Sequence, residues 1–149
     1  MVDHLTSAQR SLNMSRVLPK DTLLEINFRS KLHKSGFRFR KNVKGIPGNP
    51  DVLLPKHNAV IFIHGCFWHG HKKCKRSSLP KTNTVFWKKK IQSNVKRDKL
   101  SQQSLKELGF RVAIVWGCAL SNKEKVQQSI SSVAIWLKST KDYLEIPKN

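Results

Sequence analysis

The sequence is poor in acidic residues and lacks long apolar runs. Nine Asp and Glu stand against 29 Lys and Arg, so the 149 residues carry a net charge of +20. This excess goes far beyond what solubility requires and predicts a polyanionic partner, with nucleic acid first and an anionic membrane surface second. No apolar run approaches the ~18 residues of a spanning helix, and the N-terminus lacks the apolar stretch of a secretory signal. We therefore expect a cytoplasmic protein that binds nucleic acid.

Sulfur is also scarce. The only cysteines are Cys66, Cys74 and Cys118. An odd number argues against a disulfide framework and favours a metal site or plain thiols. The length predicts a single domain over residues 1–149, large enough to bury a core without disulfides.

Hydrophobic periodicity and turn residues predict a mixed order of helices and strands. The expected elements are a helix at 22–35, strands at 37–43, 51–54 and 59–64, a basic helix at 84–108, a buried strand at 111–116 and a helix at 121–139. This order predicts an α/β fold, a mixed sheet flanked by helices. Residues 1–20 are expected to form a basic arm, and residues 140–149 a loose tail.

The stretch 59–74, AVIFIHGCFWHGHKKC, holds the densest chemistry of the chain. Cys66, His71 and Cys74 offer three soft ligands, and Cys118 follows the buried strand. Four such ligands in a tetrahedron suit a structural Zn²⁺ site, which leaves no open position for chemistry. The alternative is a set of buried thiols with a surface histidine.

Acidic and imidazole side chains form a second set. Asp51 begins one arm of a predicted hairpin and His64 ends the other, so the two positions can meet. Asp51 is a hard oxygen ligand suited to Mg²⁺, and His64 or His69 can take a proton from water near neutral pH. Alternatively, Asp51 caps a turn and both histidines are solvated. Glu25 fits a capping box with Thr22, and it also lies beside the apolar stripe of its helix, where it can lean into a site.

Three aromatic residues lie among lysines and arginines. Phe67 and Trp68 follow the strand at 59–64, and Trp87 begins the basic helix. Apolar wedges of this kind unstack base pairs when they enter DNA. Ordinary core aromatics are the alternative, but the surrounding cations favour a DNA-facing patch.

These motifs together resemble the very-short-patch repair endonucleases of bacteria. The resemblance runs from Arg10 to about Lys125. It is carried by RSLNM at 10–14, Asp21-Thr22 with Glu25, PGNPD at 47–51, VIFIHGCFWH at 60–69, Phe86-Trp87, Asn94 with Arg97-Asp98, ELGFRV at 107–112 and VWGC at 115–118. The HGCFWH string with PGNPD upstream is highly specific.

The resemblance implies a restriction-endonuclease-like fold and a DNA nick 5′ to the thymine of a T·G mismatch, the product of 5-methylcytosine deamination. It implies that Asp51 and the backbone carbonyl of Ile63 hold a catalytic Mg²⁺. His69 supported by Glu25 would act on the water, and His64 would stabilise charge at the scissile phosphate.

The same resemblance assigns the remaining groups. It places a structural Zn²⁺ on Cys66, His71, Cys74 and Cys118, and it gives Phe67, Trp68, Trp87, Met14 and Asn13 contacts with DNA. It implies a monomer acting on double-stranded DNA at the nucleoid, with mismatch-repair proteins as candidate partners and no membrane.

The sequence departs from the family pattern at three points. Ile63 stands where Thr is expected, one extra residue separates His71 from Cys74, and the acid-x-Lys of common restriction-type nucleases is missing. Two other functions stay open at this stage. One is a zinc-stabilised DNA-binding module without catalysis, and the other is a related nuclease with relaxed mismatch choice.

Overall fold

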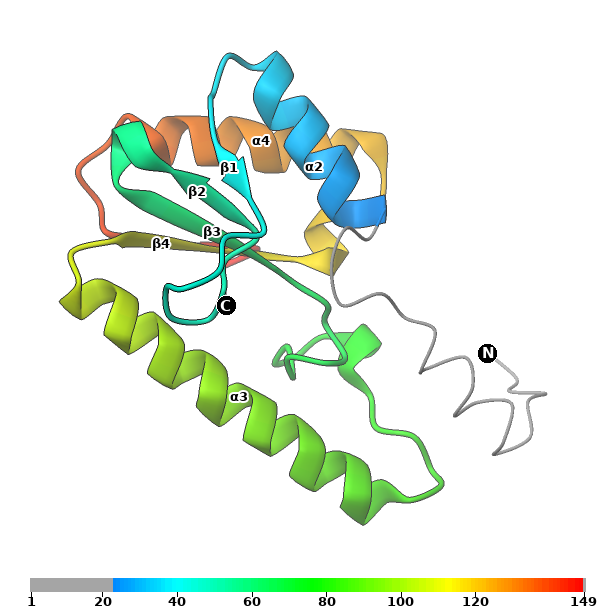
Figure 1. The fold of residues 1–149 in the computed structure, drawn as a ribbon. Helices are drawn as coiled ribbons and strands as arrows, with labels where there is room; N and C mark the ends of the chain where they lie inside the picture. The colour runs from blue at the N-terminus through cyan, green and yellow to red at the C-terminus, as the bar shows by residue number, and fades with distance from the viewer. Residues whose placement is uncertain (1–22, 149) are drawn as a thin grey trace.

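The computed structural model describes residues 23–148, which form one mixed five-stranded sheet covered by helices on both faces (Figure 1). The sheet has the order β1-β2-β3-β4-β5. Its strands are β1 (Arg40–Lys41), β2 (Val52–Leu54), β3 (Ala59–His64), β4 (Arg111–Trp116) and β5 (Tyr143–Ile146). β1, β2 and β3 pair antiparallel, whereas β3, β4 and β5 pair parallel. The α/β fold class predicted from the element order is therefore confirmed.

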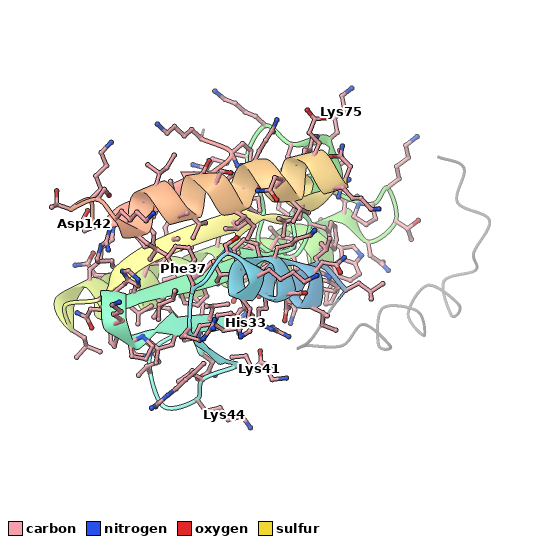
Figure 2. The ribbon with its side chains drawn as sticks, turned by 90° about the horizontal axis from the view of Figure 1, so that it is seen from above. His33, Phe37, Lys41, Lys44, Lys75 and Asp142 are labelled. Atoms are coloured by element: carbon pink, nitrogen blue, oxygen red, sulfur yellow. The ribbon has the colours of Figure 1, made fainter. Side chains whose placement is uncertain are left out.

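Two helices cover one face and one long helix covers the other. α2 (Leu23–Lys34) and α4 (Lys123–Leu137) lie side by side over the sheet, as Figure 2 shows from above. Lysine side chains such as Lys44 and Lys75 project outward from this body. The opposite face is covered by α3 (Thr84–Glu107). The central strands β3 and β4 are buried almost throughout because both faces of the sheet are covered.

The two faces of β3 separate two hydrophobic cores. Ile61 and Ile63 pack with Phe28 of α2 and Ile130 of α4 in one core. Alternate residues of β3 and β4, among them Phe62, pack with Leu105 of α3 in the other. Because side chains alternate along a strand, His64 points to the α3 face. The fold thus sets His64 at the end of β3 on the side of the basic helix.

Most predicted elements match the structure within two residues, and the antiparallel hairpin of β2 and β3 is confirmed. The strand predicted at 37–43 is shorter, because only Arg40 and Lys41 pair with β2. The helix predicted from residue 121 begins at Lys123, because its N-cap is Asn122. The Asn122 side chain accepts a hydrogen bond from the backbone N–H of Lys125 at 2.8 Å.

The prediction of a loose tail at 140–149 is wrong. Residues Tyr143–Ile146 form β5, which pairs parallel with β4 along the sheet edge. Arg111 holds the approach to this strand by donating to the backbone carbonyls of Trp136 at 2.6 Å and Lys141 at 3.0 Å. The predicted N-terminal arm lies outside the described residues, as does Thr22.

Candidate active site and metal centre

Four soft ligands meet behind the end of β3. Cys66, His71 and Cys74 come from the loop that follows β3, and Cys118 comes from the turn that follows β4. Because β3 and β4 are parallel neighbours, their C-terminal ends lie at the same sheet edge. One ligand atom from each residue lies within 4.8 Å of the others. We call these four residues the soft-ligand cluster.

The cluster has the dimensions of a tetrahedral metal site. The Cys118 Sγ and His71 Nδ1 atoms lie 3.6 Å apart, which matches the ~3.6 Å edge of a tetrahedron with a metal–sulfur bond of about 2.3 Å and a metal–nitrogen bond of about 2.0–2.1 Å. The backbone N–H of Cys118 also donates to Cys66 Sγ at 3.3 Å. Burial, with the neighbouring thiols, raises the pKa of Cys66 to about 12. A metal cation would reverse this preference for the neutral thiol, so the residues present fit a metal ion.

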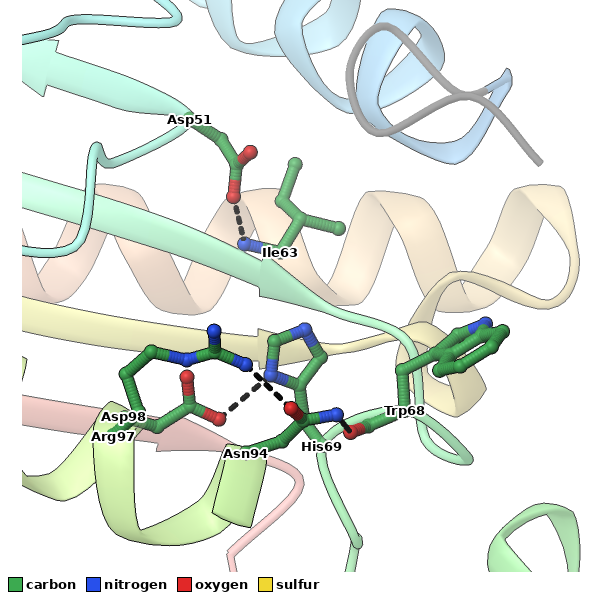
Figure 3. Close-up of polar contacts among 7 residues, drawn as sticks. All are labelled: Asp51, Ile63, Trp68, His69, Asn94, Arg97 and Asp98. Carbon is green, nitrogen blue, oxygen red and sulfur yellow. Dashed lines mark hydrogen bonds and ion pairs between the residues drawn. The ribbon is translucent and has the colours of Figure 1, made fainter. Parts of the chain in front are cut away.

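Asp51 lies at the start of β2 and reaches across to β3. Its Oδ2 atom accepts a hydrogen bond from the backbone N–H of Ile63 at 2.6 Å (Figure 3). Burial raises the pKa of Asp51 to about 7, a rise to which the negative charge of Glu25 adds and which the Ile63 hydrogen bond opposes. A half-buried carboxylate with so strong a tendency to take up a proton is equally suited to a cation.

The two predicted histidines form a stacked pair on the other side of β3. The rings of His64 and His69 lie 3.8 Å apart and 5° from parallel. Burial and the neighbouring His69 lower the pKa of His64 to about 3, so this ring is neutral at physiological pH. The Nδ1 atom of His69 lies 2.7 Å from Asp98 Oδ2. Since a carboxylate only accepts, Nδ1 carries the proton and Nε2 is the basic nitrogen.

The acid that hydrogen-bonds His69 is Asp98, and the support of His69 by Glu25 that the resemblance implies stays a prediction. Asp98 lies on α3, 29 residues further along the chain. Glu25 is buried on α2 and pairs with Arg29 at 3.5 Å, close enough to Asp51 to affect its pKa. Asp98 belongs to one of the segments that carry the family resemblance, so the sequence contained a signal for it. Its contact with His69 could not be predicted because the two residues lie far apart along the chain. We call Asp51, His64, His69 and Asp98 the acid–imidazole site.

The hairpin predicted that the side chains of Asp51 and His64 would meet directly, but the two side chains lie on opposite sides of β3. Asp51 contacts the backbone of β3, and the cluster of close ligand atoms on the far side comprises His64, His69 and Asp98. The charge on His69 still lowers the pKa of Asp51. A cleft opens beside the two imidazoles, and its lining includes His64, His69, Lys72, Asp98, Lys99 and Gln102.

The predicted aromatic residues gather on the loop and the first turn of α3. Trp87 lies 5.6 Å from Phe67 and 5.9 Å from Trp68 between ring centroids, in edge-to-face geometry. Phe86, which precedes Trp87 on α3, is 59% exposed, and its ring centroid lies 5.1 Å from that of Trp87. The Asn94 side chain donates to the backbone carbonyl of Trp68 at 2.9 Å, which ties the loop to α3. Asn13 and Met14 lie outside the described residues.

An acid and two imidazoles at the edge of a mixed sheet, beside a lysine-rich helix, define a class of protein. On an α/β, restriction-endonuclease-like fold, such a site is suited to the hydrolysis of a phosphodiester. No helix among residues 23–148 is long and apolar enough to cross a membrane.

Comparison with known proteins gives the family. A family model described as DNA mismatch endonuclease Vsr matches residues 2–76. The chain is 44% identical to the DNA mismatch endonuclease Vsr of Escherichia coli, over 85% of this chain and 80% of the relative. It is 45% identical to Type II nicking enzyme V.NmeAIP of Neisseria meningitidis, over 83% and 87% of the two chains. Type II nicking enzyme V.XorIIP of Xanthomonas oryzae is 40% identical, over 89% and 97%.

The chain belongs to the Vsr family of DNA mismatch endonucleases, and it is a strand-nicking endonuclease.

Proposed function

We propose that this enzyme nicks one strand of duplex DNA 5′ to the thymine of a T·G mismatch, in a Mg²⁺-dependent reaction that begins very-short-patch repair. The observation that carries the proposal is the position of the Asp51 carboxylate, half-buried against the Ile63 amide with a pKa of about 7. Such a group is costly to keep charged without a cation, which is expected of a site that evolved to bind one.

The imidazole side of the site supplies the water chemistry. Asp98 holds His69 so that its Nε2 atom is free to accept a proton from the attacking water. His64, neutral and stacked on His69, is suited to donate a hydrogen bond to the scissile phosphate. Lys72 and Lys99 line the same cleft and attract the anionic backbone. Hydrolysis then requires the phosphate to bridge the Asp51 and His69 sides of β3.

Two metals complete the proposal. Asp51 and the backbone carbonyl of Ile63 would hold Mg²⁺, which supplies charge neutralisation at the phosphate when bound. The soft-ligand cluster would hold Zn²⁺ in a closed four-ligand site, which fixes the loop between β3 and α3. Glu25 would support the Mg²⁺ side through its charge beside Asp51 rather than through His69.

The aromatic group supplies the contact with the mismatch. Three aromatic rings contact one another edge-to-face beside the lysine-rich first turns of α3, namely those of Phe67, Trp68 and Trp87. A weakly stacked mismatch is easier to open than a matched pair, so a wedge favours it. Asn13 and Met14 would also contact the DNA. We propose that one monomer suffices, working in the bacterial cytoplasm with mismatch-repair proteins as partners.

A nicking assay on defined duplexes tests the proposal. Purified protein with Mg²⁺ is incubated with end-labelled duplexes that differ only in one pair, T·G or matched. We expect a nick 5′ to the thymine in the T·G duplex alone. Asp51→Ala should lower the rate at least ~1,000-fold while DNA affinity by gel shift changes less than about threefold. Glu107→Gln, an exposed acid near the end of α3, is the matched control and should nick normally.

The outcomes separate three functions. Equal nicking by Asp51→Ala and wild type would remove Asp51 from the mechanism. Binding without cleavage under any divalent cation would leave a metal-stabilised DNA-binding module. Nicking of several mismatch types at similar rates would instead indicate a nuclease with relaxed mismatch choice, so every mismatch type is included in the assay.

A further inference from the structure

A continuous series of ring contacts joins the soft-ligand cluster to the acid–imidazole site. At one end, the His71 ring stacks on Trp116 with centroids 4.1 Å apart and planes 7° from parallel. Trp116 in turn meets the ring of His64 edge-on, at 5.3 Å and 74°. His64 stacks on His69, whose Nδ1 atom bonds Asp98. Trp116 therefore contacts one residue of each group.

The backbone explains why Trp116 occupies this place. Trp116 is the last residue of β4 and lies directly opposite His64 in the parallel register of β3 and β4. It is 7% exposed, and its indole Nε1 atom has no hydrogen-bond partner among residues 23–148. A tryptophan held by a hydrogen bond would keep its orientation whatever its neighbours do. This ring is oriented by packing alone, so its position depends on the rings on either side.

We propose that Trp116 is a positioning residue that transmits the orientation of His71 to His64. The inference rests on the proposed function, because it assigns His64 to the scissile phosphate. A metal bound by the soft-ligand cluster would fix the His71 ring, the stacked indole would follow it, and the indole edge would limit the rotation of His64. The soft-ligand cluster then contributes to the rate of nicking as well as to stability, although it lies outside the reacting atoms.

The physical scale is sufficient for such an effect. Ring contacts on both sides of Trp116 restrict the orientation of the neighbouring imidazoles, and a displacement of about 1 Å at a reacting group can lower a rate ~100-fold. A shorter aliphatic side chain at position 116 removes both ring contacts at once. Phenylalanine keeps an aromatic surface for His71 and an edge for His64.

The test compares Trp116→Leu and Trp116→Phe with a matched control. Trp136→Leu replaces an equally buried tryptophan on the opposite face of the sheet, where its ring packs under Arg111. Each protein is assayed for single-turnover nicking, KM, DNA affinity, metal content and thermal stability. We expect Trp116→Leu to lose about 10–100-fold in the rate at saturating DNA with KM little changed. Trp116→Phe should recover most of the rate, and Trp136→Leu should lose stability but keep its rate when folded.

A spectroscopic readout tests the transmission itself. With ¹³C-labelled histidine, the ring C–H signals of His64 and His69 are followed as Zn²⁺ is exchanged for Cd²⁺, which has longer bonds to sulfur. In wild type both signals should move, and in Trp116→Leu they should no longer respond although His71 still does. The inference is overturned if Trp116→Leu nicks at the wild-type rate, if its loss matches that of Trp136→Leu, or if the His64 signal ignores the exchange in wild type. Failure of wild type to nick a T·G duplex would instead refute the proposed function, and the signals would still test the coupling.

Discussion

The soft-ligand cluster and the acid–imidazole site both take residues from the segment 64–71, but they differ in whether their polar groups can all be satisfied at once. Between His64 and His71, residues alternate between the two sites, since His64 and His69 belong to one and Cys66 and His71 to the other. The ligand atoms of the four side chains in the cluster surround one position, where a metal ion would bind all of them. The acid–imidazole site leaves Asp51 with a raised pKa and His64 with a lowered one, beside an open cleft.

This contrast explains how a short loop can serve two purposes. A closed four-ligand centre contributes to folding, because its ligands gain more in the folded state than in the unfolded chain. A site that holds buried ionisable groups without their partners lowers stability and keeps reactive groups available. The first region should therefore fail by unfolding, and the second should fail by losing activity.

The largest expected effect comes from opening the cluster. Cys118→Ser should abolish tight metal binding and lower the free energy of unfolding by ~4 kcal/mol or more, because loss of a metal site is among the most damaging single changes. Metal content by mass spectrometry and urea denaturation measure the two effects. His57→Asn, which changes a half-buried histidine beside Phe37, is the control and should keep both metal and stability. A Cys118→Ser protein with full metal content would show that the cluster is not the binding site.

Removing the charge of Asp51 is expected to raise the free energy of unfolding rather than lower it. Its pKa is 3.8 in the unfolded chain and about 7 in the folded protein, so burial of the charge lowers stability progressively from about pH 4 to pH 7 and constantly above that. Asp51→Asn keeps an acceptor for the Ile63 N–H without the charge. In Mg²⁺-free buffer it should be more stable than wild type by about 2–4 kcal/mol at pH 8, with a smaller gap at pH 5. Urea denaturation at both values measures this, and an equal gap at the two pH values would contradict it.

The fold could be predicted where local pattern and packing agree. The buried strands 59–64 and 111–116 have continuous apolar runs, and the structure places them as neighbours in the sheet centre. β5 was missed because YLEI is short and only half-buried, so its pairing comes from a neighbour that the local sequence does not reveal. Apolar residues alone do not define the inner face of α3, since Leu105 is buried but Leu100 is 61% exposed and the polar Asn94 is buried.

The sequence predicted which residues gather at the site, but not which of them pair with each other. The four soft ligands and the two histidines are recognisable because three of the ligands and both histidines lie within one stretch of chain. The partner of His69 could not be chosen between acids at positions 25 and 98 from spacing alone. That choice depends on which helix covers which face of the sheet, which is a property of the tertiary structure.

Gly70 tests whether the two regions can be disturbed together. It lies between His69 and His71 with φ of +63°, and a Cβ atom there would meet Ile91 Cγ2 at 2.8 Å and Val95 Cγ2 at 2.9 Å. Gly70→Ala should lower the free energy of unfolding by about 1–3 kcal/mol, from backbone strain and overpacking. It should also slow nicking, since it displaces the loop from α3. Thermal denaturation and the nicking assay measure the two losses.

A double-mutant cycle identifies the cause of that loss. Ile91→Ala removes the nearest methyl group and costs stability by itself, but it makes room for the new Cβ atom. If the clash matters, Gly70→Ala should cost less in the Ile91→Ala background than in wild type, by about 0.5 kcal/mol or more. Additive effects would show that the Ile91 contact does not contribute, and would assign the loss to backbone strain and the contact with Val95.

A substitution of Asp98 is expected to cause the smallest change in stability but a clear loss of activity. Asp98→Asn removes the charge that fixes the tautomer of His69, while the side chain keeps its shape and its partly exposed place on α3. Nicking should fall about 10–100-fold, the usual scale for loss of an orienting partner, and the free energy of unfolding should change by less than about 1 kcal/mol because the pair is partly exposed. Glu107→Gln on the same helix should leave both unchanged. If Asp98→Asn unfolded the protein as Cys118→Ser does, the pair with His69 would belong to the framework, and the division between a stabilising centre and a reactive one would not hold.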